Sequence, residues 1–123
     1  MIYVGRVYDA PVKKQGRRYL VERLWPRGIR KVDLPLEAWL KEVAPSAELR
    51  RWYQHDPAKW AEFQRRYRAE LGKNKEAWRP LLQAGRRASI VLLYSAHDTE
   101  HNSALVLKAF LDKKLTKPGS EPG

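Results

Sequence analysis

The stretch that most constrains the fold is the almost uniformly apolar run "ASIVLLYSA", residues 88–96. A strand that is apolar at every position is typical of a strand covered on both of its faces, as in the sheets of α/β proteins. The amphipathic pattern of residues 101–114 follows directly and predicts a helix. We therefore expect a strand, a short polar loop and a helix to form one unit.

The rest of the chain predicts two more strands and a helical middle. The β-branched and aromatic residues of 2–8 and the alternating residues of 17–25 are typical of strands. Apolar spacing and capping residues predict helices over residues 34–43, 46–53, 57–72 and 74–85.

This order of elements predicts a small single α/β domain over residues 1–115, with a central sheet of at least three strands flanked by helices. Three strands are few for this class, so either a further strand exists or the helical middle forms a subdomain of its own. Residues 116–123 are rich in Pro, Gly and Ser and are expected to form a disordered C-terminal tail.

Composition excludes several classes of protein. The 123 residues include no cysteine, which excludes disulfides, thiolate metal sites and a cysteine nucleophile. No apolar run approaches the roughly 20 residues that span a bilayer, and the N-terminus lacks the pattern of a signal peptide. We expect a soluble, cytoplasmic protein with no membrane partner.

The chain is strongly basic, with 25 Lys and Arg against 14 Asp and Glu and a net charge of +11. The excess is concentrated, because residues 1–31 contain nine basic and two acidic residues. Clustered positive charge attracts phosphate-bearing partners. Nucleic acid is therefore one predicted partner, bound through a basic face made by Lys13, Lys14, Arg17, Arg18, Arg65 and Arg66.

The polar loop after the apolar run contains Ser95, Asp98 and His101, and three interpretations are open. A metal site would need three or four ligands, and besides the histidines His97 and His101 only Asp98 or Glu100 is a candidate nearby, so we expect neither a metal nor a cofactor. A hydrolytic triad is conceivable, which makes His101 and Ser95 the candidate catalytic residues, but the "GxSxG" motif is absent. The third interpretation is structural, with Asp98 or Thr99 capping the last helix.

The second feature that could carry chemistry is "ERLWPRGIRK", residues 22–31. Arg23 lies in the strand pattern, where a guanidinium is rarely buried without a partner. Arg27 adjoins Gly28 in a turn, Trp25 offers a flat apolar surface, and Arg6 comes from the neighbouring strand. Arginine is well suited to bind phosphate or carboxylate through two parallel hydrogen bonds, so this turn predicts an anion site.

We expect the two features to meet in one pocket for a small anionic ligand, beyond the carboxyl ends of the strands and beside the N-terminus of the last helix. The predicted ligand-binding residues are Arg6, Arg23, Trp25, Arg27, Gly28, Tyr94, Ser95, His101 and Asn102. A basic nucleic-acid-binding module is the alternative, and an interaction domain without any site is the third possibility.

Several stretches also resemble a known family: "RVYD" (6–9), "LVERLWPRGIRK" (20–31), "LPLEAWLKEVAPSAELRRWY" (34–53) and "LLYSAHDTEHNSALVL" (92–107). They are similar to the YeaO-like branch of the domain of unknown function 488 family. The resemblance implies a compact α/β domain without an established activity. Other branches carry a cysteine just before the histidine that matches His101. Here that position is Glu100, so thiol chemistry is not implied for this chain.

Overall fold

The computed structural model describes residues 1–9 and 16–116. Within them, four parallel strands form one sheet in the order β1-β4-β2-β3. The strands are β1 (Ile2–Arg6), β2 (Arg17–Leu20), β3 (Ala38–Trp39) and β4 (Ile90–Tyr94). The predicted α/β class and flanked central sheet are confirmed. Of the predicted tail, only Thr116 is described, where it ends the last helix.

Strand β4 lies in the middle of the sheet, as its apolar sequence predicts. It pairs with β1 on one side and with β2 on the other, and all five of its residues are buried. Because the strands are parallel, the carboxyl ends of β1, β2 and β4 reach the same edge of the sheet. The polar loops that follow β2 and β4 therefore begin side by side.

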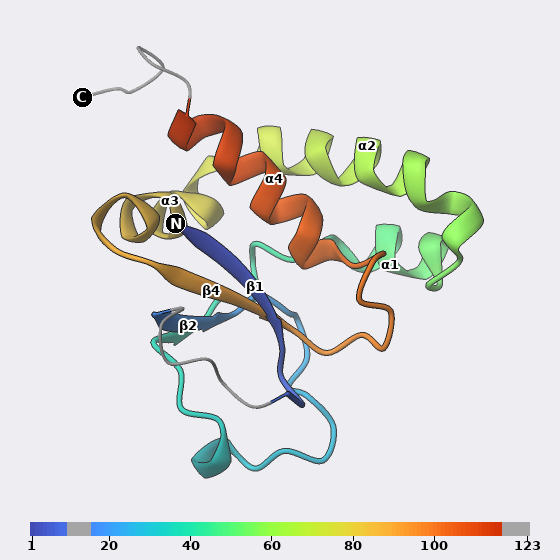
Figure 1. Cartoon of the computed structure of the whole chain (residues 1–123). Helices are drawn as coiled ribbons and strands as arrows, with labels where there is room; N and C mark the ends of the chain where they lie inside the picture. The colour runs from blue at the N-terminus through green and yellow to red at the C-terminus, as the bar shows by residue number, and fades with distance from the viewer. Residues whose placement is uncertain (10–15, 117–123) are drawn as a thin grey trace.

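The helices cover one face of the sheet (Figure 1). They are α1 (Ala47–Tyr53), α2 (Trp60–Gly72), α3 (Lys75–Arg87) and α4 (Ser103–Thr116), with a 3₁₀ turn η3 (Pro57–Lys59) before α2. Their apolar stripes and this face of the sheet enclose the main core, in which Tyr67, Leu71 and Leu107 are almost fully buried. None of the helices in the described residues is long and apolar enough to cross a membrane.

The opposite face of the sheet is covered by the chain between β2 and β3, which includes a 3₁₀ turn, η2 (Lys31–Asp33). A second, smaller core forms here around Leu20, Leu34 and Leu93, with Trp25 and Trp39 packed against it. The two indoles meet edge to face, with ring centroids 5.3 Å apart. The turn that contains Trp25 and Arg27 is thereby attached to the sheet.

The helix predicted over residues 34–43 was wrong, because this segment contains the edge strand β3. Backbone hydrogen bonds from Glu37 N to Arg18 O and from Leu40 N to Leu20 O attach it to β2. The Trp39 indole N–H also donates to Glu22 O, at 2.7 Å. These long-range hydrogen bonds outweigh the helical spacing of the apolar residues, which is a weak preference on its own.

Candidate functional site

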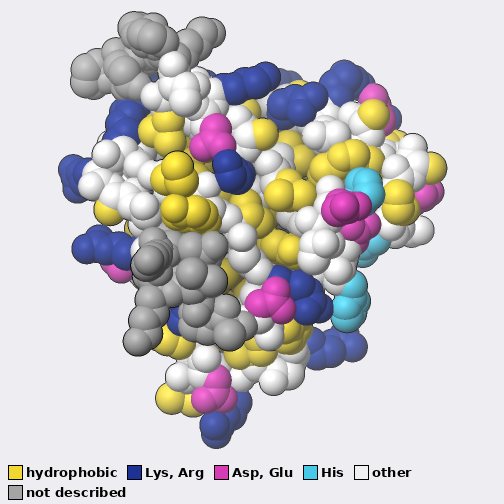
Figure 2. Space-filling view, viewed as in Figure 1, with side chains coloured by type: hydrophobic (Ala, Val, Ile, Leu, Met, Phe, Trp, Pro, Cys, Tyr) yellow, Lys and Arg dark blue, Asp and Glu magenta, His cyan; other side chains and the backbone are white. Residues whose placement is uncertain are grey.

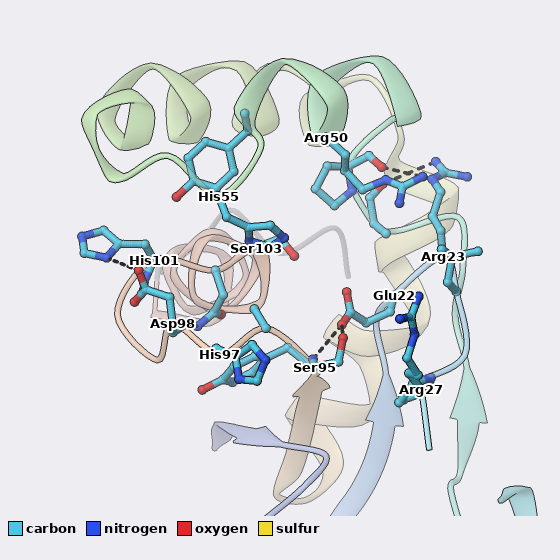
Figure 3. A pocket seen from close by; sticks show the side chains of 18 of the residues that line it. Glu22, Arg23, Arg27, Arg50, His55, Ser95, His97, Asp98, His101 and Ser103 are labelled. Carbon is cyan, nitrogen blue, oxygen red and sulfur yellow. Dashed lines mark hydrogen bonds and ion pairs between the residues drawn. The ribbon is translucent and has the colours of Figure 1, made fainter. Parts of the chain in front are cut away.

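A cavity of about 850 Å³ opens beyond the carboxyl ends of β2 and β4. Its wall is formed by the loop after β2, the loop between β4 and α4, the helix α1 with the residues around it, and Phe63 of α2. Figure 3 shows the labelled side chains arranged around this space, with Glu22 and Ser95 between a group of arginines and a group that contains Asp98 and His101. This is the place where open parallel sheets commonly bind ligands.

The structure brings most of the predicted site residues to this cavity and leaves two outside its wall. Those in the wall are Arg23, Trp25, Arg27, Tyr94, Ser95, His101 and Asn102. Arg6 lies behind the wall, where it donates to Ala96 O at 2.8 Å and lies 3.1 Å from His97 Nδ1. Gly28 has φ +80°, so it permits the turn that follows Arg27 without itself forming the wall.

Glu22 joins the two loops at the floor of the cavity. One of its carboxylate oxygens accepts a hydrogen bond from Ser95 N at 2.7 Å and another from Ser95 Oγ at 2.5 Å. The contact connects the end of β2 to the end of β4 across residues that are 73 apart in sequence. The Ser95 hydroxyl thus already donates to the Glu22 carboxylate. A contact between this hydroxyl and a ligand, as predicted, would have to replace that hydrogen bond.

The hydrolytic triad of Ser95, Asp98 and His101 was one of the three open interpretations, and in the structure the serine and the histidine of this triad have separate partners. The Ser95 hydroxyl donates to Glu22, while His101 Nδ1 lies 2.8 Å from Asp98 Oδ2. Asp98 Oδ1 also accepts the backbone N–H groups of Glu100 and His101. These bonds, first that of Glu100 N–H and then those of His101, lower the pKa of the Asp98 carboxyl below its ordinary value.

The cap of the last helix is Asn102, not Asp98 or Thr99 as the structural interpretation predicted. Asn102 is 4% exposed, its Oδ1 accepts from Leu105 N at 3.1 Å, and its amide nitrogen donates to Asp98 O. The turn around Asp98 occupies the preceding residues and therefore delays the start of the helix to Ser103. The N-terminus of α4 consequently borders the cavity, with Ser103 in its wall.

The arginines at the cavity fall into two groups. Arg23 is engaged, because its Nε donates to Pro45 O at 3.0 Å and its Nη2 to Ala44 O at 3.4 Å. The guanidinium groups of three others have no hydrogen bond or ion pair within the described residues. These are Arg27, Arg50 and Arg51. Their side chains are exposed and line the cavity, so they are available to an anion.

All three histidines of the chain also line the cavity: His55, His97 and His101. Figure 2 shows the histidine side chains along one edge of the molecule. They do not combine with carboxylates into a metal site, since no group of three or more potential metal ligands exists in residues 1–9 and 16–116. The charged and aromatic side chains of the wall are therefore the features that could bind a ligand.

An aromatic cluster packs beside His101, and two of its rings, those of Tyr53 and Phe63, line the cavity. Tyr53 stacks on Phe63 with ring centroids 4.2 Å apart, and Phe63 stacks on Trp60 at 5.7 Å. Trp60 in turn meets the His101 imidazole edge to face at 5.3 Å. The cluster packs against the ring of His101 and contributes two largely buried aromatic side chains, Tyr53 and Phe63, to this end of the cavity.

Comparison with known proteins identifies the family. The family model described as "Inactive DUF488-N3 subclade" matches residues 1–122. The chain belongs to this family. It is 43% identical over 110 residues to Uncharacterized protein YeaO of Escherichia coli (strain K12), across 89% of this chain and 96% of that protein.

Two mycobacterial proteins match the chain over a shorter stretch. Uncharacterized protein Rv3073c of Mycobacterium tuberculosis and Uncharacterized protein Mb3100c of Mycobacterium bovis are each 50% identical over 70 residues. The matches cover 57% of this chain and 59% of each relative. No solved structure matches the chain significantly.

Several residues of the cavity wall were not predicted as site residues, among them Glu22, Arg50, Arg51 and Tyr53. Glu22 is adjacent to Arg23 in the "RLWPRG" segment, and its position at the end of β2 was the available signal. The two arginines and Tyr53 belong to α1, a helix whose sequence indicates only which side packs on the core. Nothing local in that sequence indicates that the helix end borders a cavity.

Proposed function

We propose that this cavity binds a small organic anion, carrying a phosphate or a carboxylate, and holds it without chemical turnover. The observation that carries the proposal is the presence of three cavity-lining guanidinium groups, those of Arg27, Arg50 and Arg51, without an internal partner in the described residues. Guanidinium groups bind both kinds of anion through pairs of charge-assisted hydrogen bonds.

The balance of charge in the wall supports an anionic ligand. Four arginines line the cavity against two carboxylates, those of Glu22 and Asp98. Both carboxylates already accept hydrogen bonds from the protein, from Ser95 in one case and from His101 in the other. The N-terminus of α4 adds the positive end of a helix dipole at the cavity.

A binding role fits the chemistry of the wall better than catalysis does. Neither of the candidate catalytic residues contacts the other, and Ser95 Oγ is held by a carboxylate instead of by an imidazole. The matching family model is itself described as inactive. We therefore assign Ser95 and His101 to the architecture of the binding site and assign no reaction to them.

The proposal is tested by titrating the protein with inorganic phosphate at low ionic strength and following the amide signals by NMR. We expect saturable shifts around the cavity in the wild type and about tenfold weaker binding in Arg27→Ala and Arg50→Ala, because each loses a charge-assisted contact. Arg68→Ala is the matched control, since it removes the same charge from an exposed position outside the wall. Equal weakening in all three variants would show a general charge effect and contradict the proposal.

The nucleic-acid alternative remains a prediction. Lys13 and Lys14 of its predicted basic face lie outside the described residues. Among the described ones, Arg65 and Arg66 both bind Glu62, at 2.5 and 2.8 Å, which neutralises part of their charge. On the face shown in Figure 2, the Lys and Arg side chains are scattered instead of forming one continuous patch. A titration with DNA and RNA decides the question, because backbone binding should weaken steeply with salt and should not depend on Arg27.

A further inference from the structure

Tyr53 carries an unusual hydroxyl group. Its Oη is the one buried side-chain nitrogen or oxygen atom, among the described residues, that has no hydrogen-bond partner. The residue is 5% exposed and forms part of the cavity wall. Buried hydroxyl groups are nearly always satisfied, as in Tyr67, whose Oη donates to Val43 O at 2.6 Å. An unsatisfied hydroxyl in a cavity wall is a candidate contact for a bound molecule.

The phenol of Tyr53 is protonated at neutral pH, as the ordinary pKa of tyrosine dictates. Its surroundings favour that form further, because burial first, and then the nearby charges of Asp98 and Asp56, raise its pKa. Neither carboxylate accepts a hydrogen bond from it in the described structure: Asp98 accepts from His101 and two backbone N–H groups, and Asp56 accepts from Ala58 N. The Tyr53 hydroxyl can therefore donate a hydrogen bond to an acceptor on a bound molecule.

The cavity has two chemically different ends. Figure 3 shows Arg23, Arg27 and Arg50 on one side, and Asp98 and His101 on the other. Tyr53 belongs to the second side through the aromatic cluster of Phe63, Trp60 and His101. A volume of about 850 Å³ is far larger than an inorganic anion needs and lies in the range that holds drug-sized ligands.

We infer that the ligand of this cavity is a two-part organic anion. Its phosphate or carboxylate lies against Arg27 and Arg50, and its flat, uncharged body reaches the end of the cavity that Tyr53 and Phe63 line. That body carries a carbonyl or a similar acceptor, to which the Tyr53 hydroxyl donates. The inference rests on the proposed anion-binding function and adds the shape and the acceptor of the ligand to it.

The test compares inorganic phosphate, phenyl phosphate and the 3- and 4-acetylphenyl phosphates in calorimetric titrations of the whole chain. Phenyl phosphate should bind at least about tenfold more tightly than inorganic phosphate, because the ring buries apolar surface. The better acetylphenyl phosphate should gain about a further fivefold from its carbonyl acceptor. In Tyr53→Phe the gain from the ring should persist, and the gain from the carbonyl should disappear.

The thermal stability of the ligand-free protein gives an independent readout. Tyr53→Phe removes an unsatisfied hydroxyl and should melt at or above the wild-type temperature, whereas Tyr67→Phe loses a buried hydrogen bond and should melt several degrees lower. If Tyr53→Phe melts as low as Tyr67→Phe, the hydroxyl already has a partner and the inference is overturned.

The two proposals can fail separately. If inorganic phosphate binds in an Arg27-dependent manner but the aryl phosphates bind no more tightly, the two-part ligand is excluded and the anion site stands. An equal preference for the acetyl compounds in wild type and Tyr53→Phe excludes the role of the hydroxyl. If none of the four compounds binds, both the anion site and the inference built on it are wrong.

Discussion

Replacing Arg23 with alanine should destabilise the fold, in contrast to the other arginines of the cavity. The Arg23 guanidinium joins the end of β2 to the segment that leads into α1, through Pro45 O at 3.0 Å and Ala44 O at 3.4 Å. Ala44 and Pro45 are themselves buried. Removing the side chain therefore leaves buried carbonyl groups without this donor.

The magnitude follows from these contacts. A hydrogen bond from a charged donor contributes about 1.5–3 kcal/mol when it is well formed and shielded from water. The Arg23 side chain is 30% exposed and its second bond is long, so both contributions are reduced. The ion pair with Glu42 adds little, because the charges are 3.8 Å apart and Glu42 is 81% exposed. We expect a loss of about 2 kcal/mol in the free energy of unfolding.

The assay is urea unfolding followed by tryptophan fluorescence, to which the five tryptophans of the chain contribute. Arg27→Ala is the matched control, since it removes a guanidinium from the same cavity that has no partner in the described residues, and it should change stability by less than about 0.5 kcal/mol. Arg23→Lys should fall between wild type and Arg23→Ala, because an ammonium group cannot reproduce the planar fork. Equal unfolding midpoints for Arg23→Ala and Arg27→Ala would refute this account of Arg23.

Three further outcomes are expected from single substitutions. Asn102→Ala should lower the free energy of unfolding by about 2 kcal/mol in urea titrations, because it removes both the cap of α4 and a buried hydrogen bond. Gly16→Ala should cost more than about 2 kcal/mol by the same measurement, since its φ is +93° and an added Cβ would lie 2.0 Å from Ser89 O. Asp98→Asn should be less stable than wild type at pH 7 and at pH 5. Because the native pKa of Asp98 is lowered, its contribution is present above the ordinary pKa of 3.8 and disappears as the pH falls through the lower native value. Unfolding midpoints of the two proteins should therefore converge as the pH falls below 3.8, and a difference that grows on acidification would contradict the assignment.

The sequence predicted those parts of the fold that depend on local pattern. β4 is apolar at every position because it is covered on both faces, and that property can be read without knowing its neighbours. β3 has only two residues, and its strand state depends on hydrogen bonds to β2. Those hydrogen bonds form only because β2 lies alongside, which the local sequence of residues 34–43 does not encode. The helical spacing of the apolar residues therefore predicted a helix where a strand forms.

In the candidate site, too, the residues whose position follows from local pattern were predicted, and those whose position depends on the packing of other elements were not. Ser95 and His101 follow a strand and precede a helix, and the geometry of that unit places them beyond the edge of a parallel sheet. Arg50 and Tyr53 reach the cavity only because α1 packs where it does. The missing partner of the Tyr53 hydroxyl depends on several elements at once, so no local signal could have predicted it.

The "RLWPRG" segment shows how neighbouring residues of one type come to different roles. The backbone of Arg27 is fixed, because its carbonyl accepts from Tyr8 Oη at 2.8 Å and the Trp25 indole N–H closes the turn onto Ile29 O at 2.6 Å. Its guanidinium is left unengaged within the described residues, whereas that of Arg23 is used to hold the wall. A charged group on a fixed backbone loses less conformational entropy when it binds, which increases the affinity obtained from each contact. If the cavity binds the proposed anion, the turn presents Arg27 to it and uses Arg23 to build the cavity.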